Sequence, residues 1–227
     1  MRHVSRYTAV MTPAIVGCLL VVLSGCGALV TSSPSIQATG STAVVKSYPT
    51  PQGTPTIYSN ALTTPAPGWA HSPECTVTST GLMVKPNGGQ AYICLAPTSP
   101  LTDASITVTM QETSGSMSHA YGIAFHHASP QNYYFFGIDG HGRFTFTVVV
   151  NDVSHIIIPF TAAPTIHTGI NATNQLQVIT KGKLVTCLVN GKAAAQATVS
   201  TFPSGSVGLR GINDGTVVFQ QLSVAQV

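Results

Sequence analysis

The chain has 227 residues, enough for one large domain or two small ones with a sizeable core. Charged residues make up only 7% of it, against about 25% in an average soluble protein, so its polar surface must consist of Thr, Ser, Asn, Gln and His. The formal net charge is +3 and falls to +1 once a leader containing Arg2 and Arg6 is removed. No basic patch is left, which argues against a nucleic-acid partner.

The N-terminal residues have the pattern of an export signal. Arg2 and Arg6 precede an apolar run over residues 14–23, which is too short to span a bilayer as a helix of about 20 residues. The ending LSGC resembles the signal of bacterial lipoproteins, in which the cysteine becomes the lipidated first residue. We expect residues 1–25 to be a signal peptide and Cys26 to anchor the protein to the outer face of a bacterial membrane. An uncleaved anchor, or a simple signal with a chance cysteine, is the alternative.

Residues 26–67 are rich in Thr, Ser, Pro, Ala and Gly and show almost no hydrophobic periodicity. Prolines remove donors from a β-ladder, and small polar side chains supply no core. The composition predicts a disordered tether that holds the folded domain away from the lipid surface.

Three cysteines lie beyond the tether. An oxidising compartment permits a disulfide, and Cys75 with Cys94 is the natural pair. Cys187 lies in the apolar sequence KLVTCLVNG, with no basic group near it that would lower its pKa. We expect Cys187 to be a buried, inert thiol rather than a nucleophile.

Residues 68–227 consist of many short alternating or apolar runs, separated by turn residues and rich in Val, Ile, Thr, Tyr and Phe. The sequences TKGK and VNGK, at residues 180–183 and 189–192, predict two hairpin turns. No run longer than one turn has helical periodicity. This pattern predicts an all-β, two-sheet antiparallel sandwich.

A family resemblance rests on a series of segments: GIAFHHASPQNYYFFGID, GRFTF, NQLQVITKGKLVTCLVNGK, PSGSVGLRG and VVFQQLSV. Together they resemble the concanavalin A-like lectin/glucanase superfamily, and in particular the domain named for 3-keto-disaccharide hydrolases and nearby laminin-G-like modules. The resemblance spans most of residues 69–227 and implies a jelly-roll sandwich. It implies either carbohydrate binding or glycoside hydrolysis, because most of the matching positions belong to hairpins and core.

Catalysis by paired acids has little support in the sequence. The six carboxylates beyond the leader are widely spaced, and no two lie on one strand with the alternate spacing of the superfamily's glucanases: Glu74, Asp103, Glu112, Asp139, Asp152 and Asp214. A pair assembled across strands stays possible. There is no Gly-x-Ser-x-Gly elbow. We expect no cofactor.

Histidines could bind a metal, but their spacing is unfavourable. His126 and His127 are adjacent, so on a regular strand they point to opposite faces and cannot both bind one ion. One of them with Asp139 or His141 would be needed. An exposed polar role for these side chains is the simpler interpretation, and we predict no metal site.

Strand parity divides the aromatic segments into two faces. In HAYGIAFHH, it places Tyr121, Ile123, Phe125 and His127 on a core face, and Ala120, Gly122, Ala124 and His126 on the other, where small residues leave room for a covering layer or a groove. In YYFFGIDGHGRF, residues 133 and 135 face one way and 134 and 136 the other. The candidate ligand-binding residues are His126, Tyr134, Asp139, His141, Arg143 and Arg210.

We therefore predict a surface-anchored, monomeric lipoprotein whose sandwich binds carbohydrate or another cell-envelope polymer without catalysis. One alternative is a glycoside or 3-keto-disaccharide hydrolase. Another is a structural or protein-interaction lipoprotein that has no small-molecule ligand.

Overall fold

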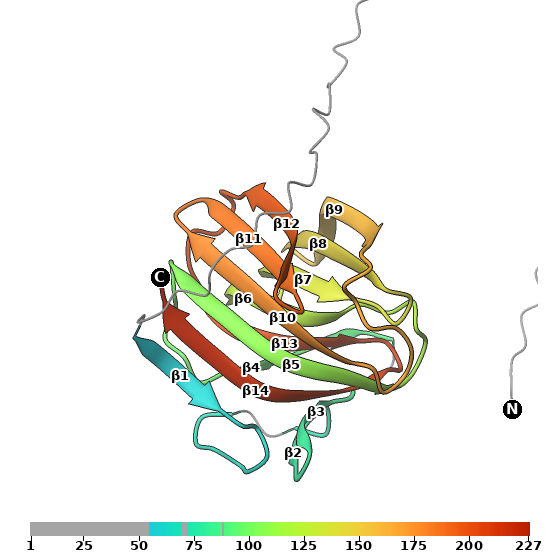
Figure 1. Ribbon diagram of the computed structural model, residues 1–227. Coiled ribbons are helices and arrows are strands. Elements are labelled where there is room, and N and C mark those ends of the chain that lie inside the picture. Colours follow the sequence, from blue (N-terminus) through green and yellow to red (C-terminus); the bar gives the residue numbers. More distant parts are fainter. Residues whose placement is uncertain (1–54, 70–71, 88) are drawn as a thin grey trace, which may run out of the picture. The chain divides into compact units, whose positions relative to one another are not determined.

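The structure is a computed structural model, and it describes residues 55–69, 72–87 and 89–227. The predicted signal peptide and Cys26 lie outside these residues. The described part contains fourteen strands in two antiparallel sheets, which confirms the two-sheet sandwich predicted from the sequence. In Figure 1 the long strands of one sheet cross the front of the domain and the other sheet lies behind them. Within the described residues no helix is long and apolar enough to cross a membrane.

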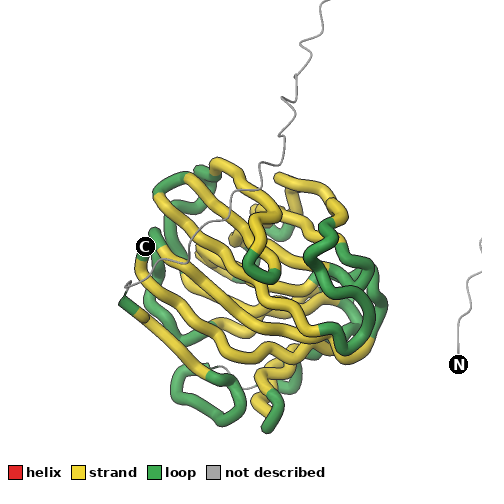
Figure 2. The backbone as a smooth tube through the Cα atoms, viewed as in Figure 1, coloured by secondary structure: helices red, strands yellow, loops and turns green. Residues whose placement is uncertain are grey.

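Sheet A has the strand order β12-β11-β10-β5-β14-β3-β2, with β1 pairing to β14 outside this path. Its strands are β1 (Thr56–Asn60), β2 (Cys75–Thr78), β3 (Gly81–Val84), β5 (Ala104–Ser114), β10 (Thr173–Lys181), β11 (Leu184–Val189), β12 (Lys192–Thr198) and β14 (Thr216–Gln226). Sheet B has the order β4-β13-β6-β7-β8-β9. Its strands are β4 (Ala91–Leu95), β6 (Tyr121–Ser129), β7 (Asn132–Ile138), β8 (Arg143–Val150), β9 (Val153–Ala162) and β13 (Ser206–Ile212). Figure 2 shows the connecting loops gathered at the ends of the strands.

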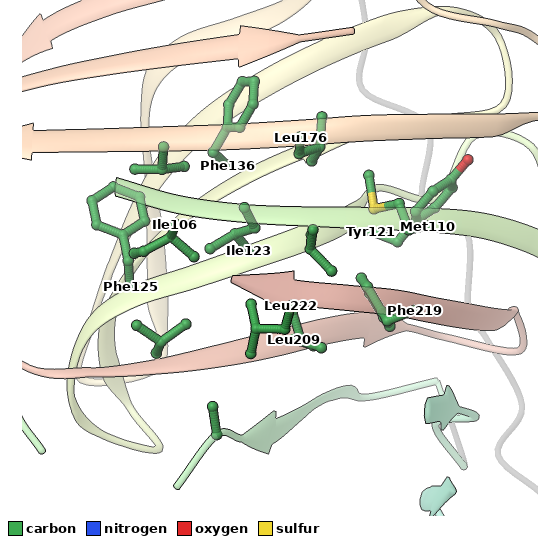
Figure 3. Packing of buried hydrophobic residues seen from close by; sticks show 14 of the residues in the cluster. Ile106, Met110, Tyr121, Ile123, Phe125, Phe136, Leu176, Leu209, Phe219 and Leu222 are labelled. Carbon is green, nitrogen blue, oxygen red and sulfur yellow. The ribbon is translucent and has the colours of Figure 1, made fainter. Parts of the chain in front are cut away.

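The core lies between the two sheets and is built from the alternate residues that face inward. Figure 3 shows part of this cluster, which includes Ile106 and Phe219 of sheet A and Ile123, Phe125 and Phe136 of sheet B. All five side chains are almost completely buried. Each such side chain contributes about 1.5–3 kcal/mol relative to exposure, so this layer is the main source of stability.

Both predicted hairpins are present. The first joins β10 to β11, with Lys181 paired to Leu184, and the second joins β11 to β12, with Val189 paired to Lys192. In the second turn Asn190 has φ 50° and its following glycine has φ 76°, the positive values that a type I′ turn requires.

The cysteines are arranged as expected. Cys75 on β2 and Cys94 on β4 form a disulfide, with their Cα atoms 5.9 Å apart, and this bond joins the two sheets. Cys187 is a free, buried cysteine, and its burial raises the pKa of the thiol. A neutral thiol in an apolar strand is the inert residue that the sequence predicts.

The prediction that residues 26–67 form a disordered tether is wrong for residues 56–67. β1 pairs with the second half of β14, whose first half pairs with β3. Leu62 is buried in the main core, and the indole nitrogen of Trp69 donates a hydrogen bond of 2.7 Å to the Tyr58 hydroxyl. The prolines that suggested disorder flank this strand rather than interrupt it, so they remove no ladder donor from it.

Candidate functional site

Two of the four consecutive aromatic residues at 133–136 point away from the main core. Tyr134 and Phe136 pack between the sheets, whereas Tyr133 and Phe135 lie on the outer face of sheet B. There they belong to a smaller apolar group, which we call the outer cluster. Its buried members are Ala120, Ala124, Tyr133, Phe135 and Val149, with the half-buried Ile93 packed against them.

Arg210 on β13 extends across the outer cluster. Its partner on β6 is Gly122, whose own partner on β7 is Gly137. The guanidinium carbon lies 4.1 Å from the centroid of the Phe135 ring. That ring in turn lies over Gly137, at the place where a Cβ atom would stand. Gly137 therefore makes room for the aromatic ring over which the guanidinium group lies.

The charge of Arg210 is not neutralised by a nearby acid. Among the described residues Arg210 forms no salt bridge, and its buried Nε has no hydrogen-bond partner. Burial lowers the pKa of Arg210, and contact with the Tyr133 hydroxyl opposes that shift. None of the six carboxylates belongs to a strand of sheet B. A half-buried cation without a counter-charge is costly, which makes it the clearest candidate for a ligand contact on this face.

His127 lies on the outer face of sheet B, against Tyr133, whereas strand parity predicted that it faces the core. Parity places His127 toward the core and His126 outward, but the strand is irregular at this point: His126 has φ 45°, and the pairing of β6 with β13 shifts register between Ser206 and Gly208. His127 consequently stacks on Tyr133, with ring centroids 5.7 Å apart and planes 22° from parallel. Burial lowers the pKa of His127, so its ring is neutral at neutral pH.

His126, a predicted ligand-binding residue, has a structural role. Its side chain is 3% exposed. Nδ1 lies 2.9 Å from the carbonyl oxygen of Phe202, and Nε2 lies 3.0 Å from that of Thr102. Both ring nitrogens lie within hydrogen-bond distance of carbonyl oxygens in two loops, so His126 has no free polar group for a ligand.

Tyr134, also a predicted ligand-binding residue, lies in the main core and is 1% exposed. Its hydroxyl oxygen accepts hydrogen bonds from the backbone N–H groups of Thr201, at 2.8 Å, and Phe202, at 3.3 Å. Tyr134 therefore stabilises the segment that precedes β13, and its side chain is not accessible to a ligand. Of the neighbouring tyrosines it is Tyr133 that lies on the outer face.

Asp139, His141 and Arg143 form the turn between β7 and β8. Asp139 is completely buried; its Oδ1 accepts hydrogen bonds from the backbone N–H groups of His141 and Arg143, at 3.1 and 2.9 Å. Its Oδ2 forms a two-point ion pair with Arg143, at 2.8 Å from Nε and 2.6 Å from Nη2. The guanidinium group of Arg143 also lies 4.8 Å from the Phe160 ring centroid. Asp139 and Arg143 thus use their polar groups to hold the turn, while His141 is exposed.

Three carboxylates that are far apart in the sequence come together at one end of the sandwich. Burial raises the pKa of Glu112 from 4.5 to about 7, with further contributions from the charges of Asp139 and Asp214. Burial also raises the pKa of Tyr121, and the charges of Glu112 and Asp139 raise it further. Glu112 is 1% exposed, and its Oε2 has no hydrogen-bond partner. Spacing along the chain gave no sign of this group, because its members come from separate strands and turns.

This carboxylate group lacks the access that a glycosidase site needs. Glu112 and Asp139 are both buried, and Asp139 is already paired with Arg143. Asp214 is exposed, with its side chain 3.3 Å from the ring of His119. A general acid and a base must both reach the glycosidic bond, and here only one of the three carboxylates faces solvent.

No three His, Cys, Asp or Glu side chains within the described residues are placed to hold a metal ion. The set considered from the sequence is divided: the two ring nitrogens of His126 face backbone carbonyls, His127 stacks on Tyr133, and Asp139 is paired with Arg143.

A shallow groove of about 330 Å³ lies on the outer face of sheet A. It is lined by uncharged groups from β1, β5, β10 and β14 and the residues next to them: Ser59, Asn60, Ala61, Thr107, Thr109, Gln175, Gln221 and Ser223. It has amides and hydroxyls but no aromatic ring or charge.

The fold is shared with solved structures. The chain resembles the carbohydrate-binding module CBM66 from Bacillus subtilis, with a TM-score of 0.57 and 17% identity over 77% of this chain and 98% of that one. It is similar to a galectin-like protein of unknown function from Bacillus subtilis, with a TM-score of 0.59 and 11% identity over 81% and 98%. It also resembles the β-glucanase of Bacillus licheniformis, with a TM-score of 0.54 and 9% identity over 78% and 100%.

These structures confirm the concanavalin A-like sandwich that the resemblance implied. The fold is common to carbohydrate-binding modules and glycoside hydrolases, so it does not choose between them. No protein-family model matches the chain, and no curated protein matches it.

Proposed function

We propose that the sandwich binds saccharides on the outer face of sheet B, without catalysis, and that Arg210 is the principal ligand contact. The observation that carries the proposal is the placement of Arg210, whose guanidinium carbon lies over the Phe135 ring and which has no carboxylate partner among the described residues. A guanidinium group carries five N–H donors in a fixed plane. Donors held in this way suit the hydroxyl and ring oxygens of a sugar.

The aromatic residues support this contact rather than make it. Tyr133 and Phe135 are 4% and 2% exposed, so they offer little ring surface for stacking on a sugar. Phe135 packs against the guanidinium group of Arg210, and Tyr133 packs against the ring of His127. Because these side chains are already held in place, ligand binding costs less of their conformational entropy. His127 adds a neutral ring that can donate or accept one hydrogen bond at the margin of the site.

A binding function is favoured over hydrolysis because, of the three carboxylates that come together in the described part of the chain, Glu112 and Asp139 are buried. The fold agrees with either function. The general position of the proposed site, a face of small residues on β6, is the one that strand parity indicated.

The test is a glycan-array and calorimetric survey of the full-length chain, purified in detergent. We expect binding to one class of glycan, and a loss of affinity of at least about tenfold in Arg210→Gln, because a hydrogen bond to a charged group contributes about 1.5–3 kcal/mol. Gln175→Ala in the groove of sheet A is the matched control and should bind normally. Binding that is lost in the control and kept in Arg210→Gln would place the site on sheet A. Recovery of one partner protein and no glycan would favour a structural or protein-interaction role.

We also propose that the protein is displayed on the outer face of a bacterial membrane as a monomer through lipid on Cys26. The support is the sequence alone: a positive N-terminus, a short apolar run and LSGC. Cys26→Ser should release the chain from the membrane fraction or leave it with an uncleaved leader. Mass spectrometry of an N-terminal peptide without added acyl chains in the unaltered protein would contradict this proposal.

A further inference from the structure

We infer that the ligand is an anionic saccharide whose charge is a carboxylate, as in a uronic acid, and that Arg210 binds this carboxylate. The inference rests on the proposed function, because it specifies the chemical class of the ligand at the same site. The observation behind it is the charge of the site: the guanidinium group of Arg210 lies over Phe135, and among the described residues no carboxylate forms a salt bridge with it.

The two sheets differ in how their charges are distributed. The strands of sheet B contain two arginines and no carboxylate, and the ion pair of Arg143 with the buried Asp139 of the β7–β8 turn leaves Arg210 as the unpaired charge. The other acids are held elsewhere. Asp103 accepts a hydrogen bond of 2.8 Å from the backbone of Gly182 at the β10–β11 turn, and Asp214 lies beside His119.

The immediate surroundings of Arg210 contain only neutral partners. Among the described residues, Tyr133 is the ionisable side chain whose contact with the guanidinium group opposes the lowering of its pKa. The neighbouring residues on β4 and β6 in the same register are Ile93 and Gly122. A neutral sugar would leave the charge uncompensated in a half-buried position, whereas an anionic sugar would compensate it.

The geometry favours a carboxylate over a phosphate monoester. The guanidinium carbon lies over the Phe135 ring, so ligands reach the group from the side away from that ring, where a planar carboxylate can accept two parallel N–H bonds. One guanidinium balances the single charge of a carboxylate. A phosphate monoester carries about −1.5 to −2 at pH 7 and would need a second cation, which the strands next to β13 do not provide.

The experiment compares three probes of similar size on the full-length chain in detergent: an oligogalacturonate, the matching neutral galacto-oligosaccharide, and a phosphorylated oligosaccharide. We expect the oligogalacturonate to bind about ten- to a hundredfold more tightly than the neutral probe, and this preference to weaken as salt is raised. Arg210→Gln should abolish the preference, and Arg210→Lys should retain part of it because charge remains without the planar pair of donors. Lys192→Gln removes an equal charge from exposed β12 of sheet A and should change nothing.

Failures of the inference and of the proposed function give different results. Equal binding of neutral and acidic probes, with both weakened by Arg210→Gln, overturns the carboxylate inference and leaves saccharide binding intact. Preference for the phosphorylated probe also overturns it. Absence of binding to every glycan, with all variants folded by circular dichroism, overturns the proposed function and the inference with it.

Discussion

The buried carboxyl of Glu112 makes the stability of this protein depend on pH in a direction that can be tested. The side chain projects from β5 into the end of the core, where its Oε2 lies near the Cα of Gly140 and has no hydrogen-bond partner. Burial, together with the charges of Asp139 and Asp214, raises its pKa from 4.5 to about 7. The proton is therefore held more tightly in the folded state than in the unfolded chain.

The sign of the effect follows from proton linkage. Between pH 4.5 and 7 the unfolded chain loses the Glu112 proton while the folded protein keeps it, so the free energy of unfolding falls as pH rises through this window. The favourable contribution is complete below pH 4.5 and lost above pH 7. With 1.36 kcal/mol per pKa unit, a change from 4.5 to about 7 corresponds to roughly 3 kcal/mol.

Glu112→Gln removes the titrating proton and keeps the shape of the side chain. We expect the variant to be more stable than the unaltered protein by roughly 3 kcal/mol at pH 8 and to match it within about 1 kcal/mol at pH 4.5. Urea unfolding at a series of pH values, followed by the fluorescence of the buried Trp69, measures both free energies. Using the difference between the two proteins cancels the titration of the groups that do not interact with Glu112.

Asp152→Asn is the matched control, because Asp152 is exposed and its φ of 65° suits asparagine. Its free-energy difference from the unaltered protein should not change with pH. If the difference between Glu112→Gln and the unaltered protein is equally flat from pH 4.5 to 8, the carboxyl is not held protonated by its surroundings and the reasoning fails.

Three further predictions concern the fold and the proposed site. A chain shortened to begin at Gly68 loses β1 and should unfold at lower urea than one that begins at residue 55; equal midpoints would mean that β1 adds nothing to the sandwich. Replacing both Cys75 and Cys94 by Ser should lower the free energy of unfolding by about 3 kcal/mol, measured with and without reductant, and an unchanged value would show that the bond does not constrain the unfolded chain. Gly137→Ala places a methyl group where the ring of Phe135 lies, so it should displace the ring and weaken glycan binding at least threefold; unchanged affinity in a folded variant would separate the ring from the site.

Local patterns in the sequence predicted much of this fold. Alternating apolar residues predicted the sheets, Asn190 with the glycine after it predicted a hairpin, and the parity of residues 133–136 predicted that alternate rings face opposite ways, although not which pair faces the core. These features depend on neighbours in the chain, and a strand's side-chain alternation follows from backbone geometry alone.

Predictions failed where a local pattern was interrupted or overridden. The irregular backbone at His126 exchanges the faces of His126 and His127, and a single residue in the left-handed region is enough to do this. The sequence did not predict β1 because this strand has few apolar residues. It is held by backbone pairing with the edge of β14, and the sequence of β1 does not reveal that this edge is available.

The candidate site shows the same division between sequence and structure. The sequence by itself identified Arg143 and Arg210 as the two arginines beyond the leader, and indicated the small residues of β6 as one face of a sheet. Only the tertiary structure distinguished the arginines: Arg143 meets Asp139 four residues away, whereas Arg210 on β13 reaches across β6 to Phe135 on β7 and forms no salt bridge among the described residues. Pairing across strands is set by register between segments far apart in the chain, and the composition of either segment does not contain that register.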